Sequence, residues 1–432
     1  MAAGPLRGAG GRRAARRAKA RKGRRIDGAR RSTAHARRAA DGPGPGAAGG
    51  AADPAADRTA DPAADRTADP AGPADLAGVR TRIDAVDEQI HALLNERALL
   101  AQRVGISKRA DGRLIDFYRP EREAEVLRRV KERNRGPLRD EEVLRLFREI
   151  MSACLAQQEP LKVAFLGPEG TFTQAAVLTH FGHSVRALPL PSVDEVFHEV
   201  ESGSVDFGVV AIENSTEGMV INTLDRFISS PVKICGEIEL RIHQHLMGRM
   251  RGLESIERVC SHQQALAQCR AWLDEHLPGI ERVAVASNAE GARRARDEKG
   301  TAAIAGATAA EVYGLTLLAS DIEDRADNTT RFFVLGRKLL AASGRDRTTL
   351  LVSVGHTDSA GALFRLLEPL ARHRISMTRI ESRPSQRRKW DYVFFIDIEG
   401  HAQEPRVARA LAALQKRASL FRILGSYPRA VT

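Results

Sequence analysis

The sequence predicts a multidomain protein that has an all-α segment, an α/β segment and an α+β segment, in that order. Three observations indicate this: a helical periodicity from Leu76, an alternation of buried strands and helices from Leu161, and a βαββαβ pattern in the last 85 or so residues. The length of 432 residues suits about three domains. A hydrophobic fraction of 43% allows each of them a core.

Residues 1–75 are predicted to be a disordered, basic, low-complexity extension. They contain few large aliphatic side chains, and the repeat ADPAADRT occurs in them twice. Residues 1–40 hold 14 Lys and Arg and one acid, so the rest of the chain carries a net charge of −1 against +12 for the whole. An inert or misassigned extension, a nucleic-acid-binding tail and an organellar transit peptide stay open for this segment. We expect no specific nucleic-acid partner for the body of the protein.

Composition also excludes several classes of protein. No run of 18 apolar residues occurs, so we expect no membrane-spanning helix. The four cysteines form no CxxC pair, which predicts neither a zinc site nor a disulfide framework and is typical of a reducing cytoplasm. His243 and His245 form an HxH pattern without an evident third ligand, so we favour a structural role and expect no metal and no cofactor.

The all-α segment begins with a helix of about 33 residues, which ends near the sequence ADG at 110–112. Its apolar stripe comprises Val79, Ile83, Val86, Ile90, Leu93, Leu100 and Val104. Such a helix is about 50 Å long, so it must project or pack against another chain. Two shorter helices are predicted at about 120–134 and 140–158.

Arg97 occupies a position of the stripe where an apolar residue is due, and a buried arginine needs a partner or an anion. Lys108 lies about three turns further along the same face, so both side chains can converge on a small dicarboxylate. Arg80 lies about 25 Å away on another face and would serve a site completed by a second chain. The alternative is that all three are ordinary surface residues.

Residues 76–159 resemble the all-helical chorismate mutase family, an intertwined dimer of three-helix chains. The matching positions are Arg80, Arg97, Lys108, Arg122, Glu123 and Gln158. The resemblance implies that the arginines bind the carboxylates of chorismate, with Arg80 donated by the other subunit. It further implies that Lys108 and Gln158 donate to the ether oxygen and that Glu123 binds the ring hydroxyl. Cys154 and Arg119 depart from residues found in some members.

The α/β segment carries polar motifs at strand ends, where open sheets bind ligands. They are GPEGTFTQAA at 167–176, IENSTEG at 212–218, SHQQALAQC at 261–269 and NTTRF at 328–332. Taken singly, each is typical of turns, helix caps or a strand arginine. The buried runs LKVAFLG, VDFGVVAI, VAVAS and AAIAG predict a largely parallel sheet.

Together these motifs resemble prephenate dehydratase over about residues 162–336. The resemblance implies two α/β lobes like those of a periplasmic binding protein, with a cleft in which prephenate loses hydroxide and carboxylate to give phenylpyruvate. It nominates Thr330 as the hydroxyl at the leaving group and Arg331 as the carboxylate anchor. The implied binding groups are Thr171, Glu213, Asn214 and Ser215, with Glu213 or a water relaying the proton. Gln263 and Ala211 replace prolines of the family pattern.

The last segment predicts a ferredoxin-like sandwich and resembles the ACT domain, a small-molecule module of amino-acid metabolism. Its matching residues are Gly361, Ala362 and Leu363 at the first helix and Glu381, Ser382, Arg383 and Pro384 after the second strand. The resemblance implies phenylalanine bound where two such domains pair, with feedback inhibition. A dimerisation module without ligand is the alternative.

The resemblances imply a bifunctional enzyme that converts chorismate to prephenate and then to phenylpyruvate, inhibited by phenylalanine. We expect domains at 76–159, 162–339 and 348–432, a cytoplasmic homodimer or dimer of dimers, and only small-molecule ligands. A non-enzymatic amino-acid-responsive regulator is one alternative, although a helix-turn-helix pattern is missing from the sequence. A dehydratase whose helices 76–159 only dimerise is another.

Overall fold

The computed structural model describes residues 76–110, 118–354, 360–385 and 391–431. The predicted disorder of residues 1–75 and the loop at 111–117 lie outside these ranges, as does the side chain of Lys108. In the part of the chain that is described, no helix is both long and apolar enough to cross a membrane.

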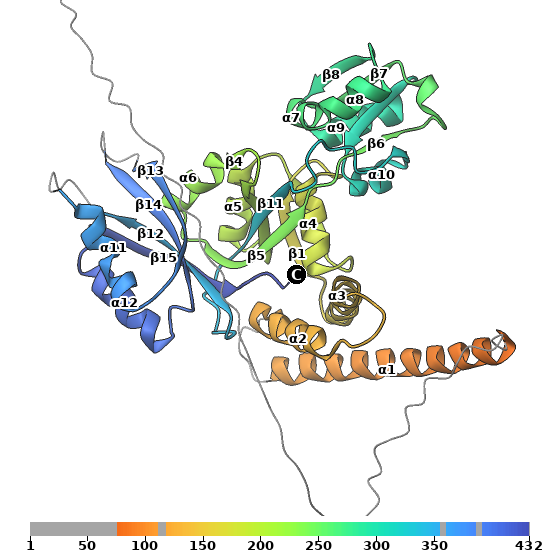
Figure 1. Ribbon diagram of the computed structural model, residues 1–432. Coiled ribbons are helices and arrows are strands. Elements are labelled where there is room, and N and C mark those ends of the chain that lie inside the picture. Colours follow the sequence, from red (N-terminus) through yellow and green to blue (C-terminus); the bar gives the residue numbers. More distant parts are fainter. Residues whose placement is uncertain (1–75, 111–117, 355–359, 386–390, 432) are drawn as a thin grey trace, which may run out of the picture. The chain divides into compact units, whose positions relative to one another are not determined.

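Three helices form the first part, as predicted (Figure 1): α1 at Leu76–Ala110, α2 at Pro120–Arg133 and α3 at Asp140–Ala156. Pro120 occupies the first turn of α2, where a missing N–H is harmless, and three acids occupy the first turn of α3. The apolar stripe of α1 is exposed in the single chain, with Ile83 53% and Ile90 49% accessible. An exposed apolar stripe of this length is typical of an interaction surface.

The first α/β sheet has the strand order β2-β1-β3-β11-β5, with β4 paired to β3. Its strands are β1 (Lys162–Leu166), β2 (Arg186–Leu190), β3 (Phe207–Asn214), β4 (Gly218–Met219), β5 (Lys233–Arg241) and β11 (Thr329–Gly336). Its helices are α4 (Phe172–Phe181), α5 (Val193–Ser202) and α6 (Ile221–Ser229). The predicted largely parallel sheet is wrong in part, because β11 runs antiparallel to both β3 and β5.

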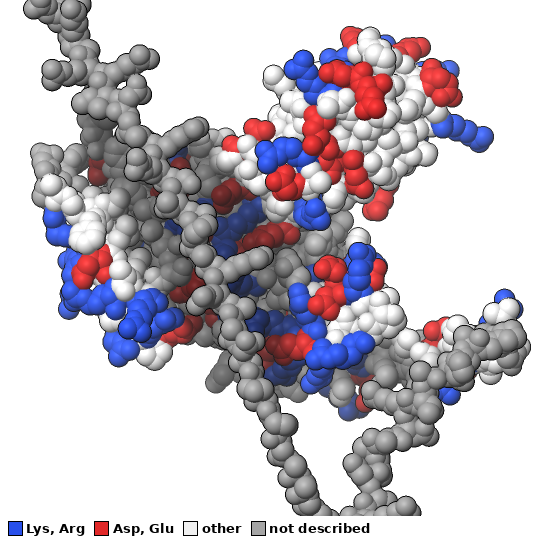
Figure 2. Space-filling model, viewed as in Figure 1, with Lys and Arg blue, Asp and Glu red and all other residues white. Residues whose placement is uncertain are grey.

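The second sheet has the order β10-β6-β9-β7-β8. Its strands are β6 (His245–Gly248), β7 (Arg258–His262), β8 (Glu281–Val285), β9 (Thr301–Ala305) and β10 (Thr316–Ala319). It carries a 3₁₀ turn (Leu253–Ser255) and the helices α7 (Gln263–Gln268), α8 (Arg270–His276), α9 (Asn288–Asp297) and α10 (Ala307–Tyr313). The chain enters after β5 and returns before β11, which confirms the predicted two-lobed arrangement. In Figure 2, blue and red side chains are interspersed over this lobe.

The C-terminal sheet is antiparallel, with the order β13-β14-β12-β15. Its elements are β12 (Asp346–Ser353), α11 (Ala362–Arg372), β13 (Met377–Pro384), β14 (Tyr392–Glu399), α12 (Pro405–Gln415) and β15 (Leu420–Pro428). The predicted βαββαβ order is confirmed. The motif at 381–384 lies within β13 rather than after it, and Pro384 is tolerated there because β13 is an edge strand.

One hydrophobic cluster joins the first α/β sheet to the C-terminal sheet. Phe333 of β11 packs edge-on against Phe227 of α6 and Tyr427 of β15, with ring centroids 6.1 and 5.8 Å apart. Gly425 of β15 lies so close to the carbonyl of Ile234 that a β-carbon there would collide with it. The two sheets therefore share a core, and a displacement of one sheet displaces the other because the core between them is close-packed.

Candidate active sites

A cavity of about 360 Å³, here called the helical cavity, is lined mostly by residues of the three helices and on one side by Leu161, Phe181, Ser184 and Val185. Four residues predicted for chorismate line it: Arg97 of α1, Arg122 and Glu123 of α2, and Gln158 just after α3. Arg80 does not line it and lies on the N-terminal part of α1, as expected if it serves a second subunit. Lys108 lies on α1, but the direction of its side chain is not described.

Gln158 is placed by a close approach of two helices. Its Nε2 donates to the carbonyl of Ala101, at 2.9 Å. A β-carbon at Gly105 would lie only 2.6 Å from Gln158 Oε1, so the glycine within α1 makes room for this amide.

Glu123 lies in an electrostatically unusual position. Burial raises its pKa to about 7, and the nearby Arg148 guanidinium and Tyr118 hydroxyl offset part of that effect. Tyr118 also contacts His180 of α4, with 3.3 Å between its hydroxyl and Nε2, and burial lowers the pKa of His180 to about 3. Glu123 can therefore exchange a proton near neutral pH.

Arg148 of α3 lines the same cavity and was missed by the sequence reasoning. Burial is the main cause that lowers its pKa, and its Nη2 donates to the carbonyl of Val431 at 2.6 Å. Arg148 lies four residues after the buried Leu144 and therefore on the apolar face of α3. A cation on an apolar face is the pattern that indicated Arg97, so the same pattern could have indicated Arg148.

A second cavity, of about 240 Å³, lies at the strand ends of the two α/β sheets. Asn214 of β3 and Thr330 of β11 line it, and the two are paired in register. Glu217 and His262 are titratable side chains in its lining. With Phe172, which also lines it, the cavity brings together residues of all four motifs recognised in the sequence.

The amide of Asn214 has an unambiguous orientation. Its Oδ1 accepts from the backbone N–H groups of Thr216 and Glu217 at 3.0 and 3.1 Å, and from the Thr216 hydroxyl at 2.6 Å. Its Nδ2 must therefore face Thr330, where it donates to Oγ1 at 2.8 Å. Because this bond occupies a lone pair of the Thr330 oxygen, the hydroxyl hydrogen is left to point elsewhere.

Further amides extend this arrangement toward the second lobe. Asn214 Nδ2 also donates to Asn328 Oδ1 at 2.8 Å, and Asn328 Nδ2 donates to Gln268 Oε1 at 3.2 Å. Gln244 and Asn288 line the cavity beyond them. Gln268 and Asn328 lie inside motifs recognised in the sequence but were not named as site residues, because their contact joins positions 60 residues apart.

The other residues predicted for prephenate are placed differently. Thr171 caps α4, where its hydroxyl accepts from the N–H of Gln174 at 3.4 Å, and its neighbour Phe172 lines the cavity. Ser215 accepts from the N–H of Thr329 at 3.0 Å. Glu213 and Arg331 are outside the lining, and their charged ends lie 3.9 Å apart.

Arg331 forms ion pairs with acids on the face of β11 that is opposite to Thr330 and the cavity. It donates to Glu237 of β5 from Nε at 3.1 Å and from Nη2 at 2.8 Å, and to Asp397 of β14 from Nη1 at 2.8 Å. The structure does not bring its guanidinium into the cavity, so its role as a carboxylate anchor stays a prediction.

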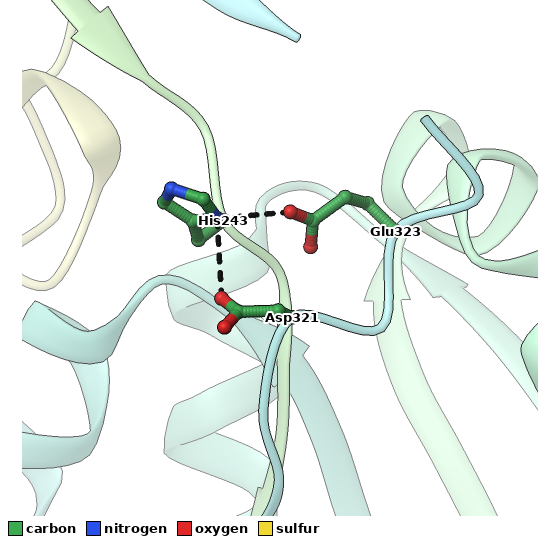
Figure 3. A group of neighbouring side chains, drawn as sticks. All are labelled: His243, Asp321 and Glu323. Atoms are coloured by element: carbon green, nitrogen blue, oxygen red, sulfur yellow. Dashed lines mark hydrogen bonds and ion pairs between the residues drawn. The ribbon is translucent and has the colours of Figure 1, made fainter. Parts of the chain in front are cut away.

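A group that could hold a cation lies where the chain crosses between the lobes (Figure 3). His243 Nδ1 lies 3.1 Å from Asp321 Oδ1 and 2.9 Å from Glu323 Oε1, and the three ligand atoms lie within 4.8 Å of one another. Sequence reasoning missed both carboxylates. The backbone N–H of Gln244 also donates to Glu323 Oε2 at 2.9 Å. These bonds tie the two crossover segments together.

The motifs predicted to bind phenylalanine lie on α11 and β13. Gly361 precedes α11 with a φ of 76°, a left-handed conformation that favours glycine. Arg383 forms a two-pronged ion pair with Asp225 of α6, with both N–O distances 3.1 Å. A cavity of about 480 Å³ beside α11 is lined by Ala362, among others, but by none of residues 381–384.

Three family models match consecutive parts of the chain. Chorismate mutase type II matches residues 79–159, prephenate dehydratase matches residues 163–339, and the ACT domain matches residues 350–415. Their order is the order predicted from the sequence.

Relatives match over nearly their whole length. A bifunctional chorismate mutase/prephenate dehydratase of Stutzerimonas stutzeri is 52% identical over 360 residues, which cover 82% of this chain and 98% of the relative. A protein of the same description from Aquifex aeolicus is 43% identical over 362 residues, covering 83% and 99%. The solved prephenate dehydratase of Arthrobacter aurescens in complex with L-Phe is 38% identical, with a TM-score of 0.58, and covers 62% of this chain and 90% of that one.

Proposed function

We propose, since this chain belongs to the bifunctional chorismate mutase/prephenate dehydratase family, that its two activities reside in the two cavities described above. Chorismate would rearrange to prephenate in the helical cavity, and prephenate would become phenylpyruvate at the strand ends. The observation that carries the proposal is that each cavity collects residues of one family motif set. The domains would span 76–159, 162–339 and 348–432.

The mutase reaction needs no proton transfer, so its site has to hold the reactive conformer and stabilise charge on the ether oxygen. Arg97 and Arg122 would bind the carboxylates, and Glu123 the ring hydroxyl. Gln158 and Lys108 would donate to the ether oxygen. Arg148, half-buried in the same lining, adds a cation that strengthens the attraction for a dianion.

A second subunit would complete this site. The exposed stripe of α1 calls for a covering surface, and a second α1 of the same pattern offers one. Arg80 would then reach the partner's cavity. We therefore propose a homodimer, or a dimer of such dimers, and size-exclusion chromatography with light scattering tests it.

In the dehydratase reaction, the ring hydroxyl of prephenate leaves as water and the ring carboxylate leaves as CO₂, while its C–C bond electrons form the aromatic ring. The hydroxyl of Thr330 would donate to the departing oxygen, since Asn214 occupies its lone pair. A threonine is a poor acid, so the proton itself must come through water or a titratable neighbour. Asn214, Ser215 and Thr171 would position the substrate, and Glu213 is the proposed relay.

The C-terminal domain would bind phenylalanine and inhibit the dehydratase. The ACT family match and the L-Phe complex of the Arthrobacter relative support this. The proposed ligand residues are Gly361, Ala362, Leu363, Glu381, Ser382, Arg383 and Pro384. The proposed location is the cytoplasm, and cell fractionation tests it; the four cysteines are free and buried, as suits a reducing compartment.

Two matched variants test the assignment. Arg97→Ala is expected to abolish prephenate formation while added prephenate is still converted. Thr330→Ala is expected to keep prephenate formation and to lose the conversion of prephenate. The activity that each variant keeps shows that the substitution has not unfolded the whole chain. Unchanged mutase activity in Arg97→Ala would leave residues 76–159 as a dimerisation bundle.

A further inference from the structure

Arg331 is next to the proposed catalytic Thr330 on β11, yet its side chain is directed away from the prephenate cavity. Successive residues of a strand face opposite sides of a sheet. Thr330 faces Asn214, whereas the Arg331 guanidinium lies 5.1 Å from the ring centre of Phe333, in the core shared with the C-terminal sheet.

The Arg331 side chain is only 12% exposed, and its acidic partners Glu237 and Asp397 are 1% and 0% exposed. A third contact, of 3.3 Å, joins its Nη2 to the hydroxyl of Tyr427. To hold a substrate carboxylate, the guanidinium would have to give up its ion pairs with two buried carboxylates. Breaking ion pairs of buried groups costs free energy, which favours the observed arrangement.

The charges in this cluster come from both domains. Arg347 of β12 also donates to Glu237, and Arg379 of β13 approaches Asp397 with 3.1 Å between Nε and Oδ2. Thr349 donates to Asp397 Oδ1 at 2.6 Å. Burial opposes the charge on Asp397, yet Arg379 and Arg331 hold the pKa of that carboxyl below its usual value. Each strand of the C-terminal sheet therefore contributes a group to the cluster that holds Arg331.

Arg379 extends the same chain of contacts to the proposed ligand motif. It lies two residues before Glu381 on β13. Its Nη1 lies 3.7 Å from the sulfur of Met219, which lines the prephenate cavity. A displacement of β13 would move Arg379 relative to Asp397, and Asp397 would in turn move Arg331. Thr330 would move as well, because it is the neighbour of Arg331 on β11.

We propose that Arg331 is a positioning residue and does not bind prephenate. It holds Thr330 in place through its ion pairs with the C-terminal sheet, and it transmits the effect of phenylalanine binding to the dehydratase site. This inference rests on the proposed function, because it concerns the regulation of that same site. It assigns the buried cluster of Arg331, Glu237, Asp397, Arg379 and Tyr427 the role of the link between the two domains.

The test compares kcat and KM for prephenate in the full-length chain and in Arg331→Gln, Arg331→Lys and Asp397→Asn. Loss of positioning lowers kcat by about 10- to 100-fold and leaves KM nearly unchanged. The phenylalanine concentration for half inhibition rises by at least about tenfold. Asp397→Asn reproduces this pattern, although Asp397 is remote from the substrate. Arg331→Lys recovers part of kcat, because it keeps the charge but not the forked geometry.

A direct substrate ligand behaves differently: KM rises while kcat is kept, and Asp397→Asn has no such effect. That result overturns the proposal. The circular dichroism spectrum and melting temperature of each variant report folding of the substituted domains. If Arg331→Gln and Asp397→Asn lose the fold, Tyr427→Phe is the milder variant, because it removes the 3.3 Å contact with Arg331 and a 2.8 Å hydrogen bond with Thr349 and leaves every charge in place. It is expected to lower kcat modestly and weaken inhibition, and unchanged values of both would overturn the proposal. A parent chain that does not convert prephenate at all would instead refute the proposed function.

Discussion

Asn214→Asp is a nearly isosteric change that tests how Thr330 is oriented. The new carboxylate keeps the three bonds accepted from Thr216 and Glu217, but it replaces the Nδ2 donor with an acceptor. The 2.8 Å bond donated to Asn328 is lost, whereas the 2.8 Å bond donated to Thr330 is replaced by one that Thr330 donates. The lost bond lowers the free energy of unfolding by about 1 kcal/mol.

The effect on catalysis is larger than the effect on stability. Thr330 can then donate its hydrogen to the carboxylate, so the donor aimed at the departing hydroxyl is lost. Removal of one such preorganised donor lowers kcat by about 100- to 1,000-fold. Asn328 cannot restore the bond by flipping its amide without breaking its 3.2 Å bond to Gln268.

Phenylpyruvate formation from prephenate measures this effect, with the melting temperature of each variant as the folding control. Thr216→Val is the matched control, because it removes a bond at the other end of the same amide and leaves Nδ2 in place. Its kcat should fall far less. If Asn214→Asp keeps kcat within about threefold of the parent, Asn214 does not orient Thr330 and the reasoning is refuted.

Three further predictions follow from the described contacts. The raised pKa of Glu123, about 7, means that the folded state holds this proton more tightly than the unfolded state, so this group's contribution to stability falls as pH rises from about 4.3 to 7. Glu123→Gln should therefore flatten the dependence of urea midpoint on pH across that window, and an unchanged slope would contradict the assigned pKa. Ile90→Glu places a charge on the exposed stripe of α1 and should yield monomers that lose mutase but keep dehydratase activity; dimers in light scattering would count against the pairing. Asp225→Asn breaks the pair with Arg383, which is partly exposed and contributes about 1 kcal/mol or less, so inhibition by phenylalanine should weaken while the melting temperature hardly moves. The charge swap Asp225→Arg with Arg383→Asp should restore inhibition if this pair matters, and full inhibition of Asp225→Asn would dismiss it.

Local periodicity was sufficient to predict most elements. The stripe of α1 has a helical repeat, and neither glycine nor proline occurs between Val79 and Val104. Gly105, which follows the stripe, makes room for Gln158. The βαββαβ order likewise follows from short alternating runs. The antiparallel β11 was missed because its direction depends on the path of the chain through the second lobe.

Side-chain partners across long sequence distances were harder to predict. No local pattern indicates that Arg331 meets Asp397, since 66 residues separate them. The period of two along a strand could have warned that Thr330 and Arg331 face opposite sides. Similarly, Asp321 and Glu323 supply the neighbours of His243 that the HxH pattern lacked.

The central claim is that one chain performs two consecutive reactions at two separate sites, and complementation tests it most directly. Arg97→Ala and Thr330→Ala are each given chorismate alone, and then the two proteins are mixed. Each variant alone should form no phenylpyruvate, whereas the mixture should form it, because prephenate released by one protein is used by the other. A mixture that stays inactive, although each variant keeps its remaining activity, or a single substitution that abolishes both reactions in a folded chain, would contradict the account.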